Sequence, residues 1–183
     1  MSCQCKSCNC ADTKKICDCD TEELIEIKGV CPGDVLRDLL DDGTTTWTQV
    51  FIPEILCLPC AKPDIEEIVK ISSCVEIISK KVIKTPDSNG LNNGEGTLLT
   101  GRKLVIEGIL RQKVIYTADV KEQSLHSAHF DVPFSIFIVL PADTLLSDKY
   151  KVEPYIEDIF VCKKSKREIF KNVTLFIKAT KIQ

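Results

Sequence analysis

A period of two in the order of apolar and polar residues marks most of the chain after its first twenty positions. In residues 67–81 the odd positions are mostly apolar and the even positions mostly polar, which predicts a strand with one buried and one wet face. The apolar odd positions are Val69, Ile71, Val75 and Ile77. Residues 168–179 repeat the pattern, with aliphatic residues on one face at Ile169, Val173, Leu175 and Ile177. Both segments are therefore predicted to be half-buried strands.

Other segments extend this pattern along the chain. Residues 47–56 are rich in strand-forming residues, and Pro53 within them predicts an edge strand or a bulge. Residues 98–120 are long enough for one bent strand or two, with Gly101 and Gly108 as candidate bends. Further strands are expected at residues 24–30, 125–140 and 155–162, and a turn-rich connection at residues 85–96.

One segment has helical rather than strand character. In residues 34–42, Asp34 can cap the N-terminus, an apolar stripe follows, and Gly43 stands just past the end. The many short strand segments predict an all-β protein. We expect a jelly-roll-like β-sandwich with one short helix over residues 21–183, preceded by an extended N-terminal arm, residues 1–20.

The arm differs from the rest of the chain because it is built from cysteine and polar residues. Its thiols follow a C-x-C-x2-C-x-C pattern and then a C-x-C pattern, at Cys3, Cys5, Cys8, Cys10, Cys17 and Cys19. Only Ile16 could enter a hydrophobic core. The arm therefore cannot fold by burial, and its function is expected to depend on thiol chemistry.

Charge and hydropathy exclude several classes of protein. The net charge is −3 and the pI is near 5.5, which argues against a nucleic-acid binder. No apolar run is long enough to span a membrane, and no secretory signal precedes the arm. These features predict synthesis in a cytoplasm, where thiols normally stay reduced. The eleven cysteines then require either a metal or later oxidation, and the odd number leaves at least one thiol to pair outside its own chain if all are oxidised.

Residues 108–141, GILRQKVIYTADVKEQSLHSAHFDVPFSIFIVLP, carry the most specific motif of the chain. A K-V-I-Y-T-A-D pattern is followed by Q-x-x-H-S-x-H-F-x-V-P-F-S-x-F-I-x-L-P. This segment resembles the SPOCS domain family of endospore-forming clostridia. The resemblance implies a β-sandwich fold and a role in spore morphogenesis or in the spore coat, exosporium or appendages. Some family members carry a C-terminal LysM module that binds peptidoglycan or a partner; this chain ends at Gln183 without one, so a morphogenetic adaptor role is less expected than a structural one.

The resemblance also explains how a protein made in a reducing cytoplasm could use many cysteines for disulfides. A spore-surface protein is made in the mother-cell cytoplasm without a signal peptide, and it meets oxidising conditions when the mother cell lyses. Disulfides are then permitted. We therefore expect a structural, self-assembling spore-surface protein, forming a head-to-tail homopolymer. Other spore-surface proteins are further candidate partners, and no nucleic acid, membrane or cofactor is expected.

The spacing within the arm favours bonds between subunits. In an extended strand the two Cα atoms of C-x-C are about 6.6–6.8 Å apart, at the upper limit of about 6.8 Å for a disulfide. Pairing to a facing subunit is easier, and the arm could also add as a strand to a neighbour's sheet edge. Two alternatives stay open: a zinc or copper(I) thiolate cluster, and a non-catalytic adaptor that binds another coat protein.

The five cysteines of the body are candidate disulfide acceptors: Cys31, Cys57, Cys60, Cys74 and Cys162. Cys57 and Cys60 have the C-x-x-C spacing of redox sites, but the helix that normally follows is absent from the pattern. Cys74 is predicted on the polar face of its strand, between Ser72 and Glu76. A buried free thiol is the alternative for Cys31 and Cys162.

No catalytic or metal-binding set emerges from the remaining residues. His126 and His129 are the only histidines, and on a strand their spacing points them to opposite faces. They are expected to pack or form hydrogen bonds rather than bind a metal. No Ser-His-Asp set or phosphate-binding loop is present, so the sequence predicts no enzyme.

Overall fold

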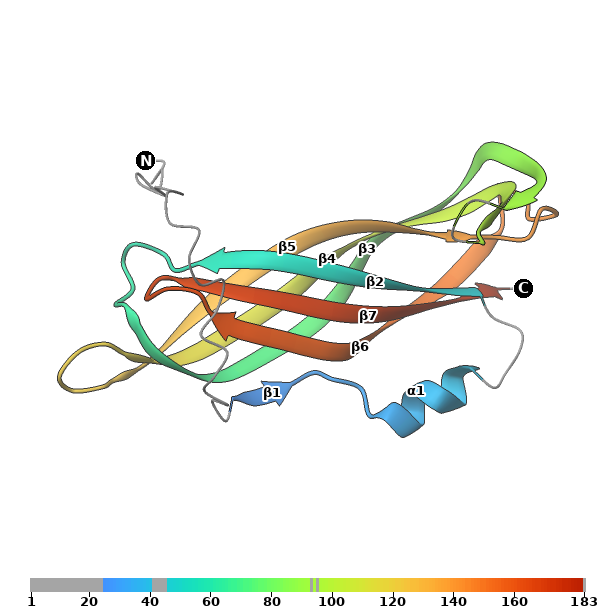
Figure 1. The fold of residues 1–183 in the computed structure, drawn as a ribbon. Helices are drawn as coiled ribbons and strands as arrows, with labels where there is room; N and C mark the ends of the chain where they lie inside the picture. Colours follow the sequence, from blue (N-terminus) through green and yellow to red (C-terminus); the bar gives the residue numbers. More distant parts are fainter. Residues whose placement is uncertain (1–24, 41–45, 93, 95, 183) are drawn as a thin grey trace.

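The computed structural model describes residues 25–40, 46–92, 94 and 96–182. Within these residues, seven strands form two facing β-sheets, beside which one short helix lies (Figure 1). The larger sheet has the order β1-β3-β4-β5, with bounds β1 Glu26–Lys28, β3 Ile65–Asn92, β4 Leu98–Ala118 and β5 Leu125–Val139. The smaller sheet has the order β2-β7-β6, with bounds β2 Thr46–Cys57, β7 Glu168–Ile182 and β6 Lys149–Lys163. The predicted all-β sandwich with one short helix is confirmed.

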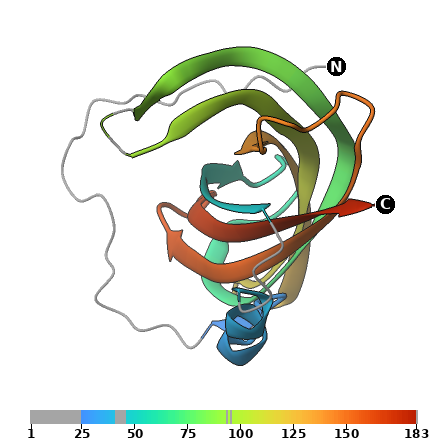
Figure 2. The ribbon, with the colours of Figure 1, turned by 90° about the vertical axis from the view of Figure 1, so that its right-hand side faces the viewer.

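The larger sheet is built around a long antiparallel hairpin of β3 and β4. Seen end-on, this hairpin curves over the sandwich (Figure 2). Its ladder contains several register shifts, which let a long strand bend. Between Leu98 and Ala118 the chain forms a single strand, so of the two alternatives for this segment the one-strand alternative is correct. Gly101 has φ +83°, a left-handed conformation that favours glycine.

The predicted alternation in β3 is wrong at one position. Ile68 pairs with Tyr116 and Lys70 pairs with Ile115, which leaves Val69 without a partner residue. This bulge shifts the parity of the strand: Val69 is 38% exposed, whereas Ile68 is 3% exposed. Ile71 returns to the core at 0% exposure.

The predicted connection at residues 85–96 is also shorter than expected. β3 continues to Asn92, although its pairing with β4 is irregular after Lys84. Asn89 and Gly90 have φ values of +49° and +80°. The turn residues therefore bend the end of the hairpin without ending strand geometry at residue 85.

β7 lies at the centre of the smaller sheet and supplies much of the core. It pairs antiparallel with β2 on one side and with β6 on the other. The predicted inner face is confirmed, with 0% exposure at Ile169, Val173, Leu175 and Ile177. β2 is an edge strand, which agrees with the prediction from Pro53.

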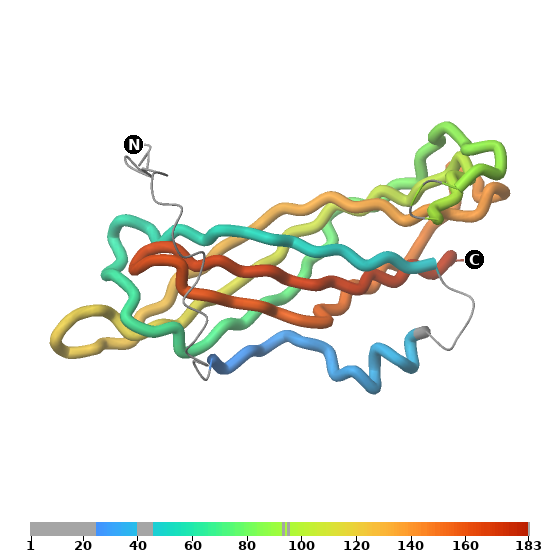
Figure 3. The backbone as a smooth tube through the Cα atoms, in the orientation of Figure 1, coloured from blue at the N-terminus to red at the C-terminus, as the bar shows by residue number. Residues whose placement is uncertain are grey.

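A short N-terminal segment closes one side of the sandwich between the two sheets. β1 runs parallel to β3, with Glu26 opposite Lys70. Val30 then bridges to Ile156 of β6, and the Cys31 amide donates to the Ile156 carbonyl at 2.8 Å. The helix α1, Gly33–Leu40, follows at this edge (Figure 3).

This segment differs from the predicted strand at residues 24–30. β1 holds only three residues, because Gly29 has φ +106° and turns the chain from one sheet towards the other. The predicted helix at residues 34–42 is confirmed in position. Its predicted end at Gly43 lies outside the described residues.

Candidate functional site

The six arm cysteines lie outside the described residues. Among the body cysteines, Cys31, Cys60 and Cys74 are free thiols, and Cys60 and Cys74 are exposed. The exposure of Cys74 agrees with its predicted place on the wet face of β3. Cys57 is exposed at the end of β2. Cys162 is 8% exposed and is not among the free thiols.

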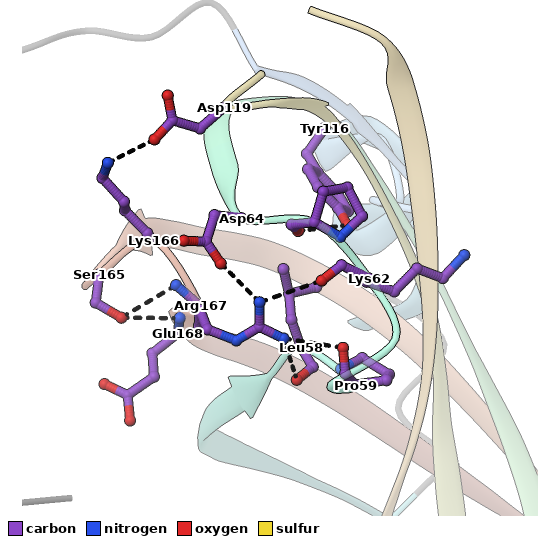
Figure 4. A network of polar contacts seen from close by, with 11 residues as sticks. Leu58, Pro59, Lys62, Asp64, Tyr116, Asp119, Ser165, Lys166, Arg167 and Glu168 are labelled. Atoms are coloured by element: carbon purple, nitrogen blue, oxygen red, sulfur yellow. Dashed lines mark hydrogen bonds and ion pairs between the residues drawn. The ribbon is translucent and has the colours of Figure 1, made fainter. Parts of the chain in front are cut away.

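The connection that carries Cys60 is held to the β6–β7 hairpin by Arg167 (Figure 4). Its guanidinium donates to the carbonyls of Leu58, Pro59 and Lys62 at 3.4, 3.0 and 3.1 Å. It also pairs with Asp64 at 2.6 Å. This connection joins the smaller sheet to the larger one, so Arg167 fixes one end of the sandwich.

The C-x-x-C pair is therefore part of a strand end and a loop. Cys57 ends β2, and Cys60 follows in a turn, in which the Lys62 amide donates to the Pro59 carbonyl at 2.9 Å. No helix follows the second cysteine before β3 begins. The helix N-terminus that activates the thiols of redox motifs is thus missing from this connection.

The outer face of the smaller sheet is aromatic and partly exposed. On β2, Trp47 is 49% exposed, Phe51 66% and Ile55 51%. Phe176 of the central strand is covered by the rings of Trp47 and Tyr155, with ring centroids 5.6 and 6.3 Å away. We call Trp47, Phe51 and Ile55 the β2 stripe. Alternate positions of one strand share a face, so the three side chains lie on the same side of β2, with Gln49 and Pro53 at the positions between them.

Within the described residues, β2 pairs only with β7. The other side of its backbone therefore has no strand partner. An edge strand with exposed apolar side chains is a template for adding a strand from another chain. Pro53 lies on this strand and removes one backbone donor. The β2 stripe and the unpaired edge together define a surface that can accept an extended segment.

The two histidines occupy ordinary positions on β5. His126 stacks on Tyr116 with ring centroids 5.9 Å apart and shares a hydrogen bond of 3.1 Å with the Ser124 hydroxyl. His129 lies opposite Lys113 in the ladder with β4. In the described part of the chain, no three His, Cys, Asp or Glu residues come together in a way that could hold a metal ion.

An interior polar cluster lies between the two sheets, and the sequence did not reveal it. Lys171 of β7 is 0% exposed, and its Nζ lies 3.4 Å from Glu54 Oε1 of β2 and 3.1 Å from the Ser73 hydroxyl of β3. The Gln112 amide of β4 donates to the same Glu54 oxygen at 2.7 Å. Four side chains from four strands thus meet in the core.

Burial moves both charged members of the cluster towards their neutral forms. Desolvation lowers the pKa of Lys171 to about 8, although Glu54 opposes this change. Desolvation also raises the pKa of Glu54, against the attraction of Lys171 and the Gln112 hydrogen bond. The neutral amine of Lys171 and the protonated carboxyl of Glu54 are therefore more populated in the core than they would be in water.

The alternation of inward and outward positions along the strands could have indicated the two charged members of this cluster. Lys171 stands between Ile169 and Val173 on the inner face of β7, and Glu54 stands between Ile52 and Leu56. A polar residue at an inward position predicts a buried polar group. Strand parity could not predict that these four residues contact one another, because the order and packing of the strands are set by the tertiary fold.

Two facing sheets, an edge strand with an apolar stripe and exposed thiols define a thiol-bearing β-sandwich protein. A comparison with protein families gives a match to the domain described as SipL, SPOCS domain, over residues 64–164. The match covers more than half of the chain, and the protein belongs to the SPOCS family. The matched region runs from just before β3 to the end of β6. No curated protein and no solved structure matches the chain significantly.

The family confirms the resemblance that residues 108–141 suggested, since these residues lie inside the matched region. The SPOCS domain indicates a spore-associated protein. Among the described residues, no helix is long and apolar enough to cross a membrane.

Proposed function

We propose that this protein is a structural subunit of the spore surface that assembles with copies of itself. The N-terminal arm of one subunit engages the body of the next, and disulfides then make the contact covalent. The observation that carries the proposal is the edge of β2 that no described strand pairs with, together with the exposed β2 stripe. Coat, exosporium and appendage are all surfaces that such a subunit could build.

The edge of β2 supplies the non-covalent part of this contact. An added strand would satisfy backbone groups along β2 and cover part of the β2 stripe. Burying apolar area contributes about 25 cal/mol per Å², so an extended arm could gain useful affinity here. Because arm and edge are different surfaces, the contact is head-to-tail and gives an open polymer when the rotation does not close.

Exposed thiols supply the covalent part. Cys57 lies at the end of β2, and Cys60 follows in the connection held by Arg167. Cys74 is a free exposed thiol on β3. A disulfide typically contributes about 2–5 kcal/mol, so several at one contact would resist heat and detergent. The body supplies structure and thiols, and we propose no catalytic turnover and no bound cofactor.

A denaturing gel tests the covalent step. The oxidised full-length protein, boiled without reductant, is expected to give a ladder that collapses to one band near 20.5 kDa on reduction. Replacement of all six arm cysteines by Ser is expected to abolish the ladder while the far-ultraviolet spectrum of the folded body is retained. A wild-type monomer in both lanes would refute self-assembly through disulfides.

A second pair of variants tests the edge of β2. Phe51→Lys places a charge in the β2 stripe and is expected to slow ladder formation at least several-fold. Leu91→Lys is the control, because Leu91 is 73% exposed at the far end of the β3–β4 hairpin. Equal rates for the two variants would show that the arm does not dock on β2.

The two alternatives give different results in the same preparations. A metal-binding protein would carry stoichiometric zinc or copper, and its arm thiols would resist alkylation until the metal is removed. An adaptor would remain monomeric when pure and oxidised. Either result would replace self-assembly as the function.

A further inference from the structure

The interior polar cluster has no part in the proposed assembly, because it is enclosed between the two sheets. Lys171 is 0% exposed, the Glu54 side chain 6%, Gln112 3% and Ser73 6%. Burying a lysine and a glutamate is costly unless their hydrogen-bonding groups are well satisfied. Apolar side chains at these four positions would avoid this cost. The presence of the polar side chains therefore needs a chemical explanation.

The cluster is only partly satisfied. Glu54 Oε2 and Gln112 Oε1 are both buried without a hydrogen-bond partner. The contact of Lys171 with Glu54 is 3.4 Å, longer than a good charge-assisted hydrogen bond. As a structural ion pair this arrangement is therefore poor.

The same arrangement places the groups needed for a reaction between the Lys171 amine and the Gln112 amide close together. Glu54 Oε1 lies 3.4 Å from the Lys171 amine nitrogen and 2.7 Å from the Gln112 amide nitrogen, so one carboxyl oxygen contacts both the nitrogen that would attack and the nitrogen that would leave. Ser73 stands directly opposite Gln112 in the β3–β4 ladder and contacts the Lys171 amine at 3.1 Å. The serine therefore holds the amine beside the strand position that carries Gln112.

We propose that Lys171 and Gln112 react with each other to form an amide cross-link, with Glu54 carrying the proton. The Lys171 Nζ lone pair attacks Gln112 Cδ and forms a C–N bond. The bond from Cδ to Nε2 breaks, and Nε2 leaves as ammonia with a proton delivered through Glu54. No oxidation occurs, and no other reactant is needed.

The protonation states of the cluster support this step. A neutral lysine is a nucleophile, and its depressed pKa increases the neutral fraction near neutral pH. A protonated Glu54, favoured by burial, is a general acid that can serve the carbonyl oxygen or the leaving amine. Gln112 Oε1 has no competing hydrogen bond.

The cross-link would tie the two layers of the sandwich together. Lys171 belongs to β7 of the smaller sheet, and Gln112 belongs to β4 of the larger sheet. A covalent bond between them closes a long loop and removes entropy from the unfolded chain. Each subunit would then resist opening by a bond that reductants do not cleave.

Intact-mass spectrometry of the purified, reduced full-length protein tests the proposal. The expected mass is lower than the sequence mass by one molecule of ammonia. A protease digest is expected to contain a branched peptide that joins the segments of Lys171 and Gln112. This peptide distinguishes the cross-link from ammonia loss at Asn89, which precedes Gly90 and can cyclise.

Single substitutions test the role of each residue in the proposed reaction. Glu54→Gln keeps the shape of the side chain but removes the proton carrier, and its mass is expected to equal the sequence mass. Glu76→Gln is the control on an exposed strand position and is expected to retain the ammonia loss. Lys171→Met and Gln112→Leu are each expected to abolish the branched peptide.

Two results would overturn the proposal. The first is a wild-type mass equal to the sequence mass after prolonged incubation of the folded protein, a result that does not depend on any variant folding. The second is an ester between Ser73 and Gln112 in place of the amide. An ester would release the same ammonia, but hydroxylamine would cleave it and the digest would join the segments of Ser73 and Gln112, whereas the amide would survive hydroxylamine.

Discussion

Gly108 lies where β4 is most crowded by a neighbouring strand. It faces Phe134 of β5 and Ile77 of β3 in the two ladders. A Cβ at this position would lie 2.5 Å from Phe134 Cζ and 2.9 Å from the Glu76 carbonyl oxygen. The missing side chain therefore makes room for an aromatic ring over the backbone, which is a common role of glycine within a strand.

Gly108→Ala is expected to lower the free energy of unfolding by about 1–3 kcal/mol, because overpacking forces the ring and the β3 backbone apart. Gly94→Ala is the matched control, since a Cβ there meets nothing within 4 Å. Urea denaturation of the two variants measures the difference. Equal midpoints would show that Phe134 can move aside without cost.

At the scale of elements, β1 is the least conventional part of the fold. It is three residues long and runs parallel to β3, and it is followed directly by a bridge to β6. Gly29 makes this path possible: its φ is +106°, and a Cβ would lie 2.0 Å from the Ser73 carbonyl oxygen. The docking of β1 on β3 thus depends on one residue without a side chain.

Gly29→Ala is expected to release β1 from β3 while the two sheets stay folded. The substitution combines an unfavourable φ with a backbone clash, at a cost of about 1–3 kcal/mol. Hydrogen exchange at the Ile27 and Lys28 amides should become much faster, whereas Gly33→Ala should leave it unchanged, because a Cβ there lies in open space. Protection of β1 in Gly29→Ala would contradict this role.

At the scale of the whole molecule, the two sheets are joined at one end by the connection from β2 to β3. The Leu58 amide donates to the Arg167 carbonyl at 2.9 Å, and the Ile65 amide donates to the Lys166 carbonyl at 2.7 Å. The Arg167 guanidinium adds its contacts from the other side (Figure 4). This end of the sandwich is therefore closed by polar contacts as well as by the core.

Arg167→Leu is expected to lower the free energy of unfolding by about 1–2 kcal/mol, because the variant loses several charge-assisted hydrogen bonds at a half-exposed site. The Lys62 amide in the connection should also exchange faster. Lys166→Met is the control in the same hairpin. It breaks one pair with Asp119 at a lysine side chain that is 67% exposed, where solvent screens the interaction and little or no change in the free energy of unfolding is expected. A loss no larger for Arg167→Leu would show that the core alone closes this end.

Features with a local cause could be predicted from the amino-acid sequence. Alternation set the strands and the inner face of β7, Pro53 marked an edge strand, and the motif of residues 108–141 indicated the family. Each of these depends on the period of a strand or on the chemistry of one residue, so neighbours in sequence were sufficient.

Contacts between residues far apart in the sequence became known from the three-dimensional fold. The bulge at Val69 follows from pairing with β4, and the division of residues 26–31 between two sheets follows from the path at Gly29. The interior cluster needs four strands to bring Lys171, Glu54, Ser73 and Gln112 together. Strand order and register are collective properties of packing, and no window of sequence contains them.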